Sequence, residues 1–178
     1  IDTSGSMKAL DYVLNGTRRS RLDVIRAVIR EFVVNRPDDR IGTVIFGTNA
    51  FAQSPLTLDH DVLLEYMDNL EAGMAGEATA IGDGIVVSVN RLKELQAKSK
   101  IIILLTDGES NAGRVQPLDA AKAAKALGIR VYTVAVGTNG LVPFPTPLGI
   151  QQARFDLDEK TLQEIARITD GRYFRAMD

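Results

Sequence analysis

The sequence predicts an α/β protein in which a mostly parallel sheet is covered by helices on both faces. Short continuous apolar runs that end in turn residues are typical of strands buried on both faces. Such runs occur at residues 40–47, 100–108 and 128–137. Amphipathic helical sequence separates each run from the next, as in alternating α/β folds. We therefore expect a three-layer, doubly wound, Rossmann-like sheet with one short antiparallel edge strand.

Composition narrows the class of protein further. The chain has 178 residues, of which 45% are hydrophobic, which is enough for one well-buried core and one domain. The 21 Lys and Arg against 23 Asp and Glu give no strong net field to attract nucleic acid or an anionic membrane. The absence of Cys excludes disulfides and thiolate metal sites. No apolar run reaches the roughly 18 residues that a membrane helix needs.

The predicted helices begin at recognisable caps. The first helix starts at Ser20, where Asp23 gives a weak capping-box pair, and Pro37 helps to end it. The second starts near Asp59. The remaining elements are helices at 81–95, 117–128 and 158–171, followed by a last strand at 171–176.

Chain direction brings three separate loops to one edge of the predicted sheet. The first loop, DTSGSM at residues 2–7, follows the end of the first strand. The strand at 40–47 turns at Thr48 and Asn49 into a short antiparallel strand, FAQS, and the second helix then returns to the same edge. Residues 73–84 and the exit of the strand at 100–108 therefore lie beside the first loop, at the carboxyl ends of parallel strands, where open α/β sheets bind ligands.

Oxygen-bearing side chains from these loops predict a divalent metal site. Asp2, Ser4 and Ser6 recur at every second residue, so in an extended loop their side chains turn to one side. Thr79 and Asp107 add a hydroxyl and a carboxylate from the other two loops. An all-oxygen set without His or Cys suits Mg2+, Mn2+ or Ca2+ better than zinc. With only two charged ligands, a bound dication would keep a position for an incoming carboxylate.

The motifs DTSGSM, TAIGDG and LLTDG, in this order, resemble the metal-ion-dependent adhesion site of von Willebrand factor type A (VWA) domains. The resemblance implies that a cation is bound by Asp2, Ser4, Ser6, Thr79 and Asp107, directly or through water. The segments RIGTVIFGTNAFAQSPLTLDH, AKSKIIILLTDGESNAG, GIRVYTVAVGTNG and GRYFRA are similar to the bacterial aerotolerance (Bat) type of membrane-anchored VWA protein. This type implies a bacterial inner-membrane location, a periplasmic domain and a role in envelope stress tolerance or complex assembly.

Compared with that family, residues 1–178 are identified as a single VWA domain that lacks most of the first strand, the last helix and the flanking membrane anchors. Membrane association is therefore expected only through anchors outside these residues. Two differences affect the rim of the site. Glu77 stands where relatives tend to have an Asp nearby, and the segment 8–19 is long.

Several residues have more than one interpretation. Thr79 suits a helix N-cap and Asp107 a turn, and both roles are compatible with metal binding. Asp83 suits a supporting residue or a cap better than a direct ligand. The single histidine, His60, is expected at the surface without a catalytic role. Arg18, Arg19 and Arg21 are expected on a solvated face, with a weak contact to an acidic partner as the alternative.

The segment 138–155 contains three prolines and is long for a connection, so we expect an irregular loop on the metal side of the sheet. It is either a tolerated surface insertion or a wall that helps to select partners. Its apolar residues slightly favour the wall.

Two functions follow from these features. The first is a non-enzymatic binding module, in which an Asp or Glu carboxylate of a partner protein completes the coordination of the metal. The second is a Mg2+-dependent phosphohydrolase of the aspartyl-phosphate type, with Asp2 as nucleophile and Asp107 as metal ligand. That chemistry needs a second carboxylate two residues after the nucleophile, where this sequence has Ser4. The binding module is therefore the preferred prediction.

Overall fold

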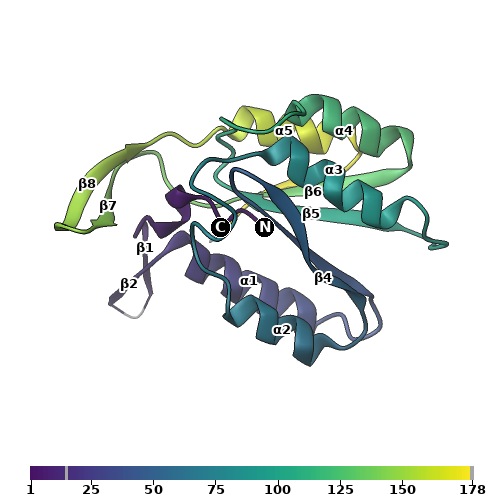
Figure 1. Cartoon of the computed structure of the whole chain (residues 1–178), viewed down its shortest axis with the longest axis horizontal. Coiled ribbons are helices and arrows are strands. Elements are labelled where there is room, and N and C mark those ends of the chain that lie inside the picture. Colours follow the sequence, from purple (N-terminus) through teal and green to yellow (C-terminus); the bar gives the residue numbers. More distant parts are fainter. Residues whose placement is uncertain (15, 177–178) are drawn as a thin grey trace.

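The computed structural model describes residues 1–14 and 16–176, and it confirms the predicted α/β architecture. A central sheet separates two helical layers (Figure 1). One layer contains α1 and α2, and the other contains α3, α4 and α5. The helices are α1 (Arg21–Val34), α2 (His60–Asp68), α3 (Ile81–Leu92), α4 (Pro117–Ala126) and α5 (Glu159–Ile168).

The sheet is mostly parallel, with one antiparallel strand at its edge, as predicted. Its strands are β3 (Ile41–Phe46), β4 (Ala50–Thr57), β5 (Lys100–Thr106), β6 (Ile129–Ala135) and β9 (Tyr173–Arg175). Strands β5, β6 and β9 are parallel neighbours in that order, whereas β4 is antiparallel to β3. The antiparallel strand extends over eight residues and is longer than the predicted FAQS segment.

Residues 1–3 join the two halves of the sheet at its centre. The N–H of Asp2 donates to the Leu105 carbonyl at 2.9 Å, and the N–H of Thr3 donates to the Phe46 carbonyl at 2.8 Å. Asp2 and Phe46 thereby form a parallel bridge. The strand order is therefore β4, β3, residues 1–3, β5, β6 and β9. Asp2 thus lies on the central strand of the sheet, where the first loop begins.

Strand β5 shows why a continuous apolar run fits this position. Leu104 belongs to the core under α3, α4 and α5, whereas its neighbour Leu105 belongs to the core under α1 and α2. Successive side chains of a strand point to opposite faces, so both must be apolar when both faces are covered. β5 is thus buried between the two cores.

The predicted helix starts are confirmed by their caps. Ser20 and Asp23 form a reciprocal capping box at α1. The side chains of Asp59 and Asp158 accept backbone N–H groups at the starts of α2 and α5. Helix α3 ends at Leu92, three residues before the predicted end at 95, where Leu95 lies 38% exposed and adds nothing to the buried stripe.

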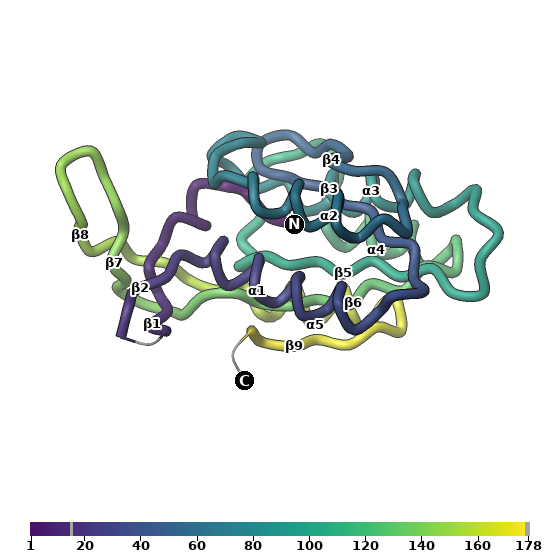
Figure 2. Tube along the Cα trace, turned by 90° about the horizontal axis from the view of Figure 1, so that it is seen from below, coloured from purple at the N-terminus to yellow at the C-terminus, as the bar shows by residue number. Residues whose placement is uncertain are grey.

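Two hairpins extend the domain at the edge where the metal site is predicted (Figures 1 and 2). The first consists of β1 (Tyr12–Leu14) and β2 (Thr17–Arg19) and follows a short 3-10 helix at Gly5–Lys8. The second consists of β7 (Gly140–Thr146) and β8 (Gly149–Phe155) and projects from the body.

The prediction of an irregular loop at 138–155 is wrong, because β7 and β8 pair in continuous antiparallel register. Proline lacks a backbone N–H donor and is tolerated at a strand edge. A two-stranded ribbon has two edges, so Pro143 and Pro145 fit here. The Pro143 carbonyl accepts the N–H of Leu10 at 2.8 Å.

Among the described residues, no helix is long and apolar enough to cross a membrane.

Candidate metal centre

The first loop presents Asp2 in a fully buried and rigid position. One carboxylate oxygen of Asp2 accepts the Ser4 N–H at 2.8 Å, and the other accepts the Thr106 hydroxyl at 2.5 Å. The Thr106 hydroxyl in turn accepts the N–H of Gly108 at 3.1 Å. Each carboxylate oxygen has more than one lone pair, so these bonds orient Asp2 and still leave room for a metal bond.

The hydroxyls of Ser4 and Ser6 lie 3.0 Å apart, so the structure brings these two predicted ligands together. The loop is not extended throughout, as the two-residue spacing suggested. It is extended only as far as Ser4 and then forms the 3-10 helix that begins at Gly5. The N–H of Gly5 donates to the Glu77 carbonyl at 3.0 Å, which fixes the first loop against the second.

The second loop holds Thr79 in a buried position and ties it to the third loop. The Thr79 N–H donates to the Asn111 side-chain oxygen at 2.9 Å, and the Thr79 carbonyl accepts the N–H groups of Asn111 and Ala112. The N-cap of α3 is Ala80 and has no side-chain cap. The Thr79 hydroxyl therefore does not serve as the N-cap of this helix.

The third loop supplies Asp107, which is only 3% exposed. Its Oδ2 accepts a hydrogen bond from Arg21 at 2.8 Å. Its Oδ1 is buried and has no hydrogen-bond partner among the described residues. A buried, unsatisfied polar atom costs roughly 1–3 kcal/mol, and a charged one more. The arrangement fits a cation that bonds to this oxygen.

The charges around the site also fit a dication. Three carboxylates with buried side chains, those of Asp2, Asp11 and Asp107, lie in this region, and the guanidinium of Arg21 pairs with two of them, Asp11 and Asp107. Burial, followed by the charge of Asp107, raises the pKa of Asp2 to about 6. A divalent cation would bring this group from a net charge of −2 to neutrality and would favour ionised Asp2.

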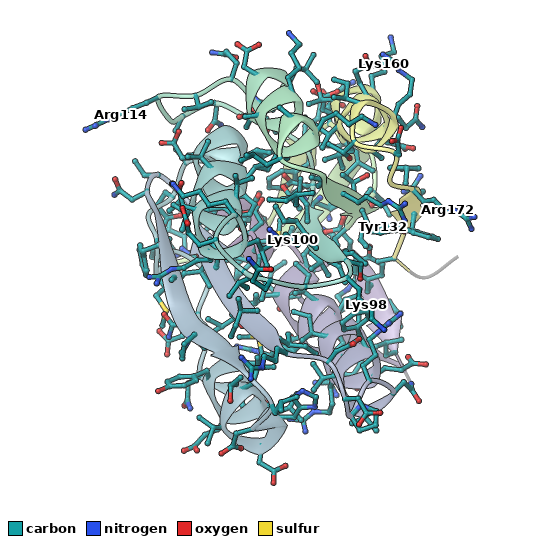
Figure 3. All side chains as sticks on the ribbon, turned by 90° about the vertical axis from the view of Figure 1, so that its right-hand side faces the viewer. Lys98, Lys100, Arg114, Tyr132, Lys160 and Arg172 are labelled. Carbon is teal, nitrogen blue, oxygen red and sulfur yellow. The ribbon has the colours of Figure 1, made fainter. Side chains whose placement is uncertain are left out.

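The remaining acidic candidates have other contacts. Asp83 accepts the backbone N–H groups of Arg114 and Val115 at 3.0 Å, so it supports the segment before α4. The Arg114 side chain extends away from the body (Figure 3). Glu77 forms an exposed ion pair with Lys8 at 2.9 Å. Among the described residues, no cluster of three or more His, Cys, Asp or Glu forms a metal site. The candidate centre thus combines two carboxylates with hydroxyls.

Two sequence-based interpretations of single residues have clear outcomes. The solvated face predicted for Arg21 is wrong, because its side chain is 1% exposed and pairs with Asp11 and Asp107. Arg18 and Arg19 are exposed, as expected. The ring of His60 is 2.9 Å from the backbone carbonyl oxygen of Asp39, away from the three loops.

Sequence reasoning missed four residues that shape the site, namely Thr106, Asn111, Arg21 and Asp11. Thr106 and Asn111 flank Asp107 closely in the sequence, and their polarity at a strand exit was a usable signal. Arg21 and Asp11 gave no such signal, because their roles depend on contacts between distant segments.

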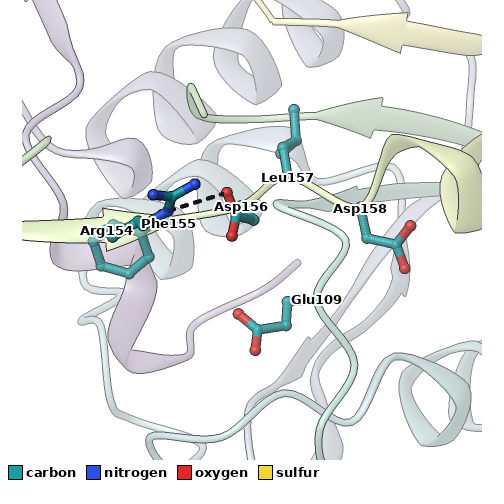
Figure 4. Close-up of a pocket in the computed structure, with 6 residues that line it drawn as sticks. All are labelled: Glu109, Arg154, Phe155, Asp156, Leu157 and Asp158. Carbon is teal, nitrogen blue, oxygen red and sulfur yellow. Dashed lines mark ion pairs between the residues drawn. The ribbon is translucent and has the colours of Figure 1, made fainter. Parts of the chain in front are cut away.

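An open pocket of about 380 Å³ lies next to the candidate centre (Figure 4). It is lined by Glu109, Arg154, Phe155, Asp156, Leu157 and Asp158. Glu109 follows Asp107 by two residues, whereas the other lining residues form the end of β8 and its connection to α5. None of the five predicted ligands lines this pocket, but the N–H of Asp158 donates to the Asp107 carbonyl at 3.2 Å, so the pocket adjoins the candidate centre.

A parallel α/β sheet whose carboxyl edge carries these three polar loops defines a class of ligand-binding α/β domain. The chain belongs to the von Willebrand factor type A domain family, whose model matches residues 1–178. VWA domains are generally protein-interaction modules, and they often bind a divalent metal at the adhesion site.

Two similar solved structures come from Bacteroides. An aerotolerance-related membrane protein of Bacteroides fragilis is 28% identical, with a TM-score of 0.83 over 98% of this chain and 87% of that chain. The conserved hypothetical protein BatB of Bacteroides thetaiotaomicron is 30% identical, with a TM-score of 0.83 over 98% of this chain and 86% of that chain. The chain is therefore related to Bat proteins.

A more distant structure shares the fold alone. It is proximal thread matrix protein 1 of the mussel byssus, which has a zinc-occupied adhesion site. It is 19% identical, with a TM-score of 0.68 over 98% of this chain and 39% of that chain. The present chain spans about half the length of the curated relatives it matches, from 52% to 56% of each.

Proposed function

We propose that this domain is a metal-dependent protein-binding module and not an enzyme. A divalent cation is held by the five predicted ligands, Asp2, Ser4, Ser6, Thr79 and Asp107, and an Asp or Glu carboxylate of a partner protein completes its coordination. The observation that carries this proposal is the buried Oδ1 of Asp107, which has no partner among the described residues.

The ligand set explains why a partner carboxylate would bind. When bound, the cation supplies the positive charge that attracts the carboxylate. The three hydroxyl ligands are neutral, so only two carboxylates offset that charge within the ligand set, and Arg21 neutralises part of the Asp107 charge. The hydrogen bonds from Ser4 and Thr106 keep Asp2 in place without adding negative charge.

Mg2+ is the proposed resident metal, with Mn2+ and Ca2+ as alternatives, because all five ligands are oxygens. The zinc in the adhesion site of the mussel protein supports a cation at this place in the fold. A zinc preference would be expected with His or Cys ligands. The five ligands include neither.

Metal binding can be tested without a partner. Isothermal titration with Mn2+ and Mg2+ should show one site in the wild type and none in Asp2→Ala or Asp107→Ala. A matched control is Asp68→Ala, which removes an exposed carboxylate paired with Arg30 on the helix layer. Equal Mn2+ binding by the wild type and Asp107→Ala would refute the proposed site.

Partner binding needs a separate test. The domain should capture its partner from a membrane extract in Mg2+ but not in EDTA, and Asp2→Ala should abolish this capture. Replacing the metal-coordinating Asp or Glu of the identified partner with Asn or Gln should have the same effect. Capture that is equally strong in EDTA would contradict the mechanism.

The phosphohydrolase alternative is not favoured by the site. Its general acid and base would occupy the position of Ser4, whose hydroxyl is 3.0 Å from that of Ser6. Lys8, which lies near the first loop in sequence, pairs with Glu77. We expect no hydrolysis of an aryl phosphate in Mg2+. Turnover that is lost in Asp2→Asn would favour the enzyme instead.

For the cellular setting, we propose a bacterial inner-membrane protein that exposes this domain to the periplasm and serves an envelope complex linked to stress or aerotolerance. The likeness to an aerotolerance-related membrane protein supports this setting. Protease added to spheroplasts should digest the domain of the full protein. Protection of the domain until the membrane is lysed would contradict a periplasmic location.

A further inference from the structure

Arg21 forms a buried bridge between two carboxylates from different parts of the chain. Its Nη1 donates to Asp107 Oδ2 at 2.8 Å. Its Nε and Nη2 donate to the two carboxylate oxygens of Asp11 at 3.0 and 2.8 Å. The side chains of Arg21, Asp11 and Asp107 are 1%, 0% and 4% exposed. This bidentate geometry uses the planar guanidinium fork and cannot be reproduced by Lys.

The same bridge holds both ends of the β7–β8 hairpin. At the start, Asp11 Oδ2 accepts the N–H of Thr138 at 2.7 Å and its hydroxyl at 3.1 Å. At the end, the ring centre of Phe155 lies 4.7 Å from the guanidinium carbon of Arg21. The buried side chain of Arg21 therefore connects both ends of the hairpin to Asp107 of the candidate metal centre.

Close packing at Gly137 keeps this connection short. Gly137 has a φ of 115°, and an added Cβ would lie 2.7 Å from the guanidinium of Arg21. Its N–H donates to the Tyr12 hydroxyl at 2.7 Å. The segment that enters the hairpin is thus packed closely against Arg21, so a shift of Arg21 would also displace this segment.

We infer that Arg21 is a positioning residue that couples metal occupancy to the order of the β7–β8 hairpin. This inference rests on the proposed metal-binding function. Arg21 holds Asp107 through Oδ2, so Oδ1 remains for the metal. A dication held by Oδ1 would offset the charge of Asp107, so the guanidinium of Arg21 would pair more strongly with Asp11 and would hold Asp11 more firmly in its place beside Thr138.

Coupling of this kind is reciprocal. If metal orders the hairpin, then loosening the contact between the hairpin and Arg21 must weaken metal binding by the same factor. A different result is expected if Arg21 forms only a local ion pair with Asp107. Removing the positive charge of Arg21 would then strengthen cation binding, and metal would not change the order of the hairpin.

The test is hydrogen exchange of the hairpin amides, measured together with Mn2+ affinity. In the wild type, saturating Mn2+ should slow exchange in residues 138–157 about fivefold or more, the lower range of typical allosteric coupling. Arg21→Gln and Arg21→Lys should lose this protection. They should also bind Mn2+ about 10-fold more weakly, as found for residues that support metal ligands.

Arg30→Gln on the same helix is the matched control, because its ion pair with Asp68 is half exposed and distant from the loops. It should behave like the wild type. If the Arg21 variants do not fold, Phe155→Ala provides the second test, since it removes the ring against the guanidinium and keeps both ion pairs of Arg21. It should reduce both metal-induced protection and Mn2+ affinity.

The outcomes separate the two claims. Mn2+ binding without hairpin protection in the wild type would overturn the coupling and leave the metal site intact. Arg21→Gln that binds Mn2+ at least as tightly as the wild type would overturn the positioning role. No Mn2+ binding by the folded wild type would overturn the proposed function itself.

Discussion

At the scale of single residues, Asp2 shows how a destabilising buried carboxyl fits the candidate metal centre. Its carboxylate is fully buried, and its pKa is raised to about 6, first by burial and then by Asp107. Ionisation of Asp2 therefore costs more free energy in the metal-free fold than in the unfolded chain. A cation would reverse this effect by favouring the charged carboxylate.

This argument predicts a pH dependence. The folded state holds the Asp2 proton up to a higher pH than the unfolded chain, whose ordinary value is 3.8. The contribution of Asp2 to stability in EDTA should therefore decline as pH rises from about 4 to 6 and stay low above. Thermal melts should show Asp2→Asn gaining stability relative to the wild type over this range.

The contribution of Asp2 is obtained from the difference in stability between Asp2→Asn and the wild type at each pH. This difference is needed because other carboxylates make stability change with pH in the opposite direction. Asp170, for example, has a pKa that is lowered by its bond to Lys125. A difference between Asp2→Asn and the wild type that is constant from pH 4 to 7 would contradict the raised pKa of Asp2.

Asn111 is the second residue-scale prediction. Its side-chain oxygen accepts the N–H of Thr79 at 2.9 Å, so it aligns the second loop with the third. Asn111→Ala should weaken Mn2+ binding about 10-fold while the fold is retained, as for other supporting residues. Isothermal titration measures this, with Asn90→Ala, an exposed change on α3, as control. Unchanged affinity would remove Asn111 from the site.

At the scale of elements, helix α3 approaches its neighbouring segment closely through Gly82. A Cβ at this position would overlap the Val115 carbonyl oxygen. Gly82→Ala should therefore destabilise the domain by about 1–3 kcal/mol, the usual cost of overpacking, although Ala has the better helix propensity. Urea denaturation checks this, and Asn90→Ala in the same helix should have little effect. A stabilised Gly82→Ala would show that the segment adjusts freely.

The β7–β8 hairpin is the element whose role in partner selection stays a prediction. Leu148 and Ile150 are 89% and 64% exposed, so changing both to Ser should leave the melting temperature and Mn2+ affinity unchanged. If the hairpin is a wall for partners, the double variant should weaken the EDTA-sensitive capture of the partner. Full capture would identify the hairpin as a tolerated insertion.

At the scale of the whole molecule, the candidate centre exists only when the sheet is formed, because its ligands come from three loops. Unfolded chains cannot offer this arrangement, so metal should stabilise the fold. The expected gain is about 2.7 kcal/mol when free Mg2+ is 100 times its Kd. Calorimetry should show a higher melting temperature in Mg2+ than in EDTA. An equal rise for Asp107→Ala would mean that the ion binds elsewhere.

The order of the helices and strands could be predicted because it depends on local sequence patterns. The apolar run of β5 is long enough for a strand and must be buried on both faces, and the caps at Ser20, Asp59 and Asp158 mark helix starts. The five proposed ligands could be named for the same reason. Each lies at a strand exit or a helix entry, and alternating α/β connections bring such positions to one edge.

The sequence by itself determined the fold class, the family and the positions of the candidate ligands, since these depend on periodicity, caps and short motifs. Only the tertiary structure decided that Arg21 is buried, that one oxygen of Asp107 has no hydrogen-bond partner among the described residues and that the segment 138–155 is a hairpin. The physical reason is that long-range contacts decide these features. Arg21 and Asp107 are 86 residues apart in sequence. A charged side chain is predicted to be exposed when the buried carboxylates that pair with it are not known.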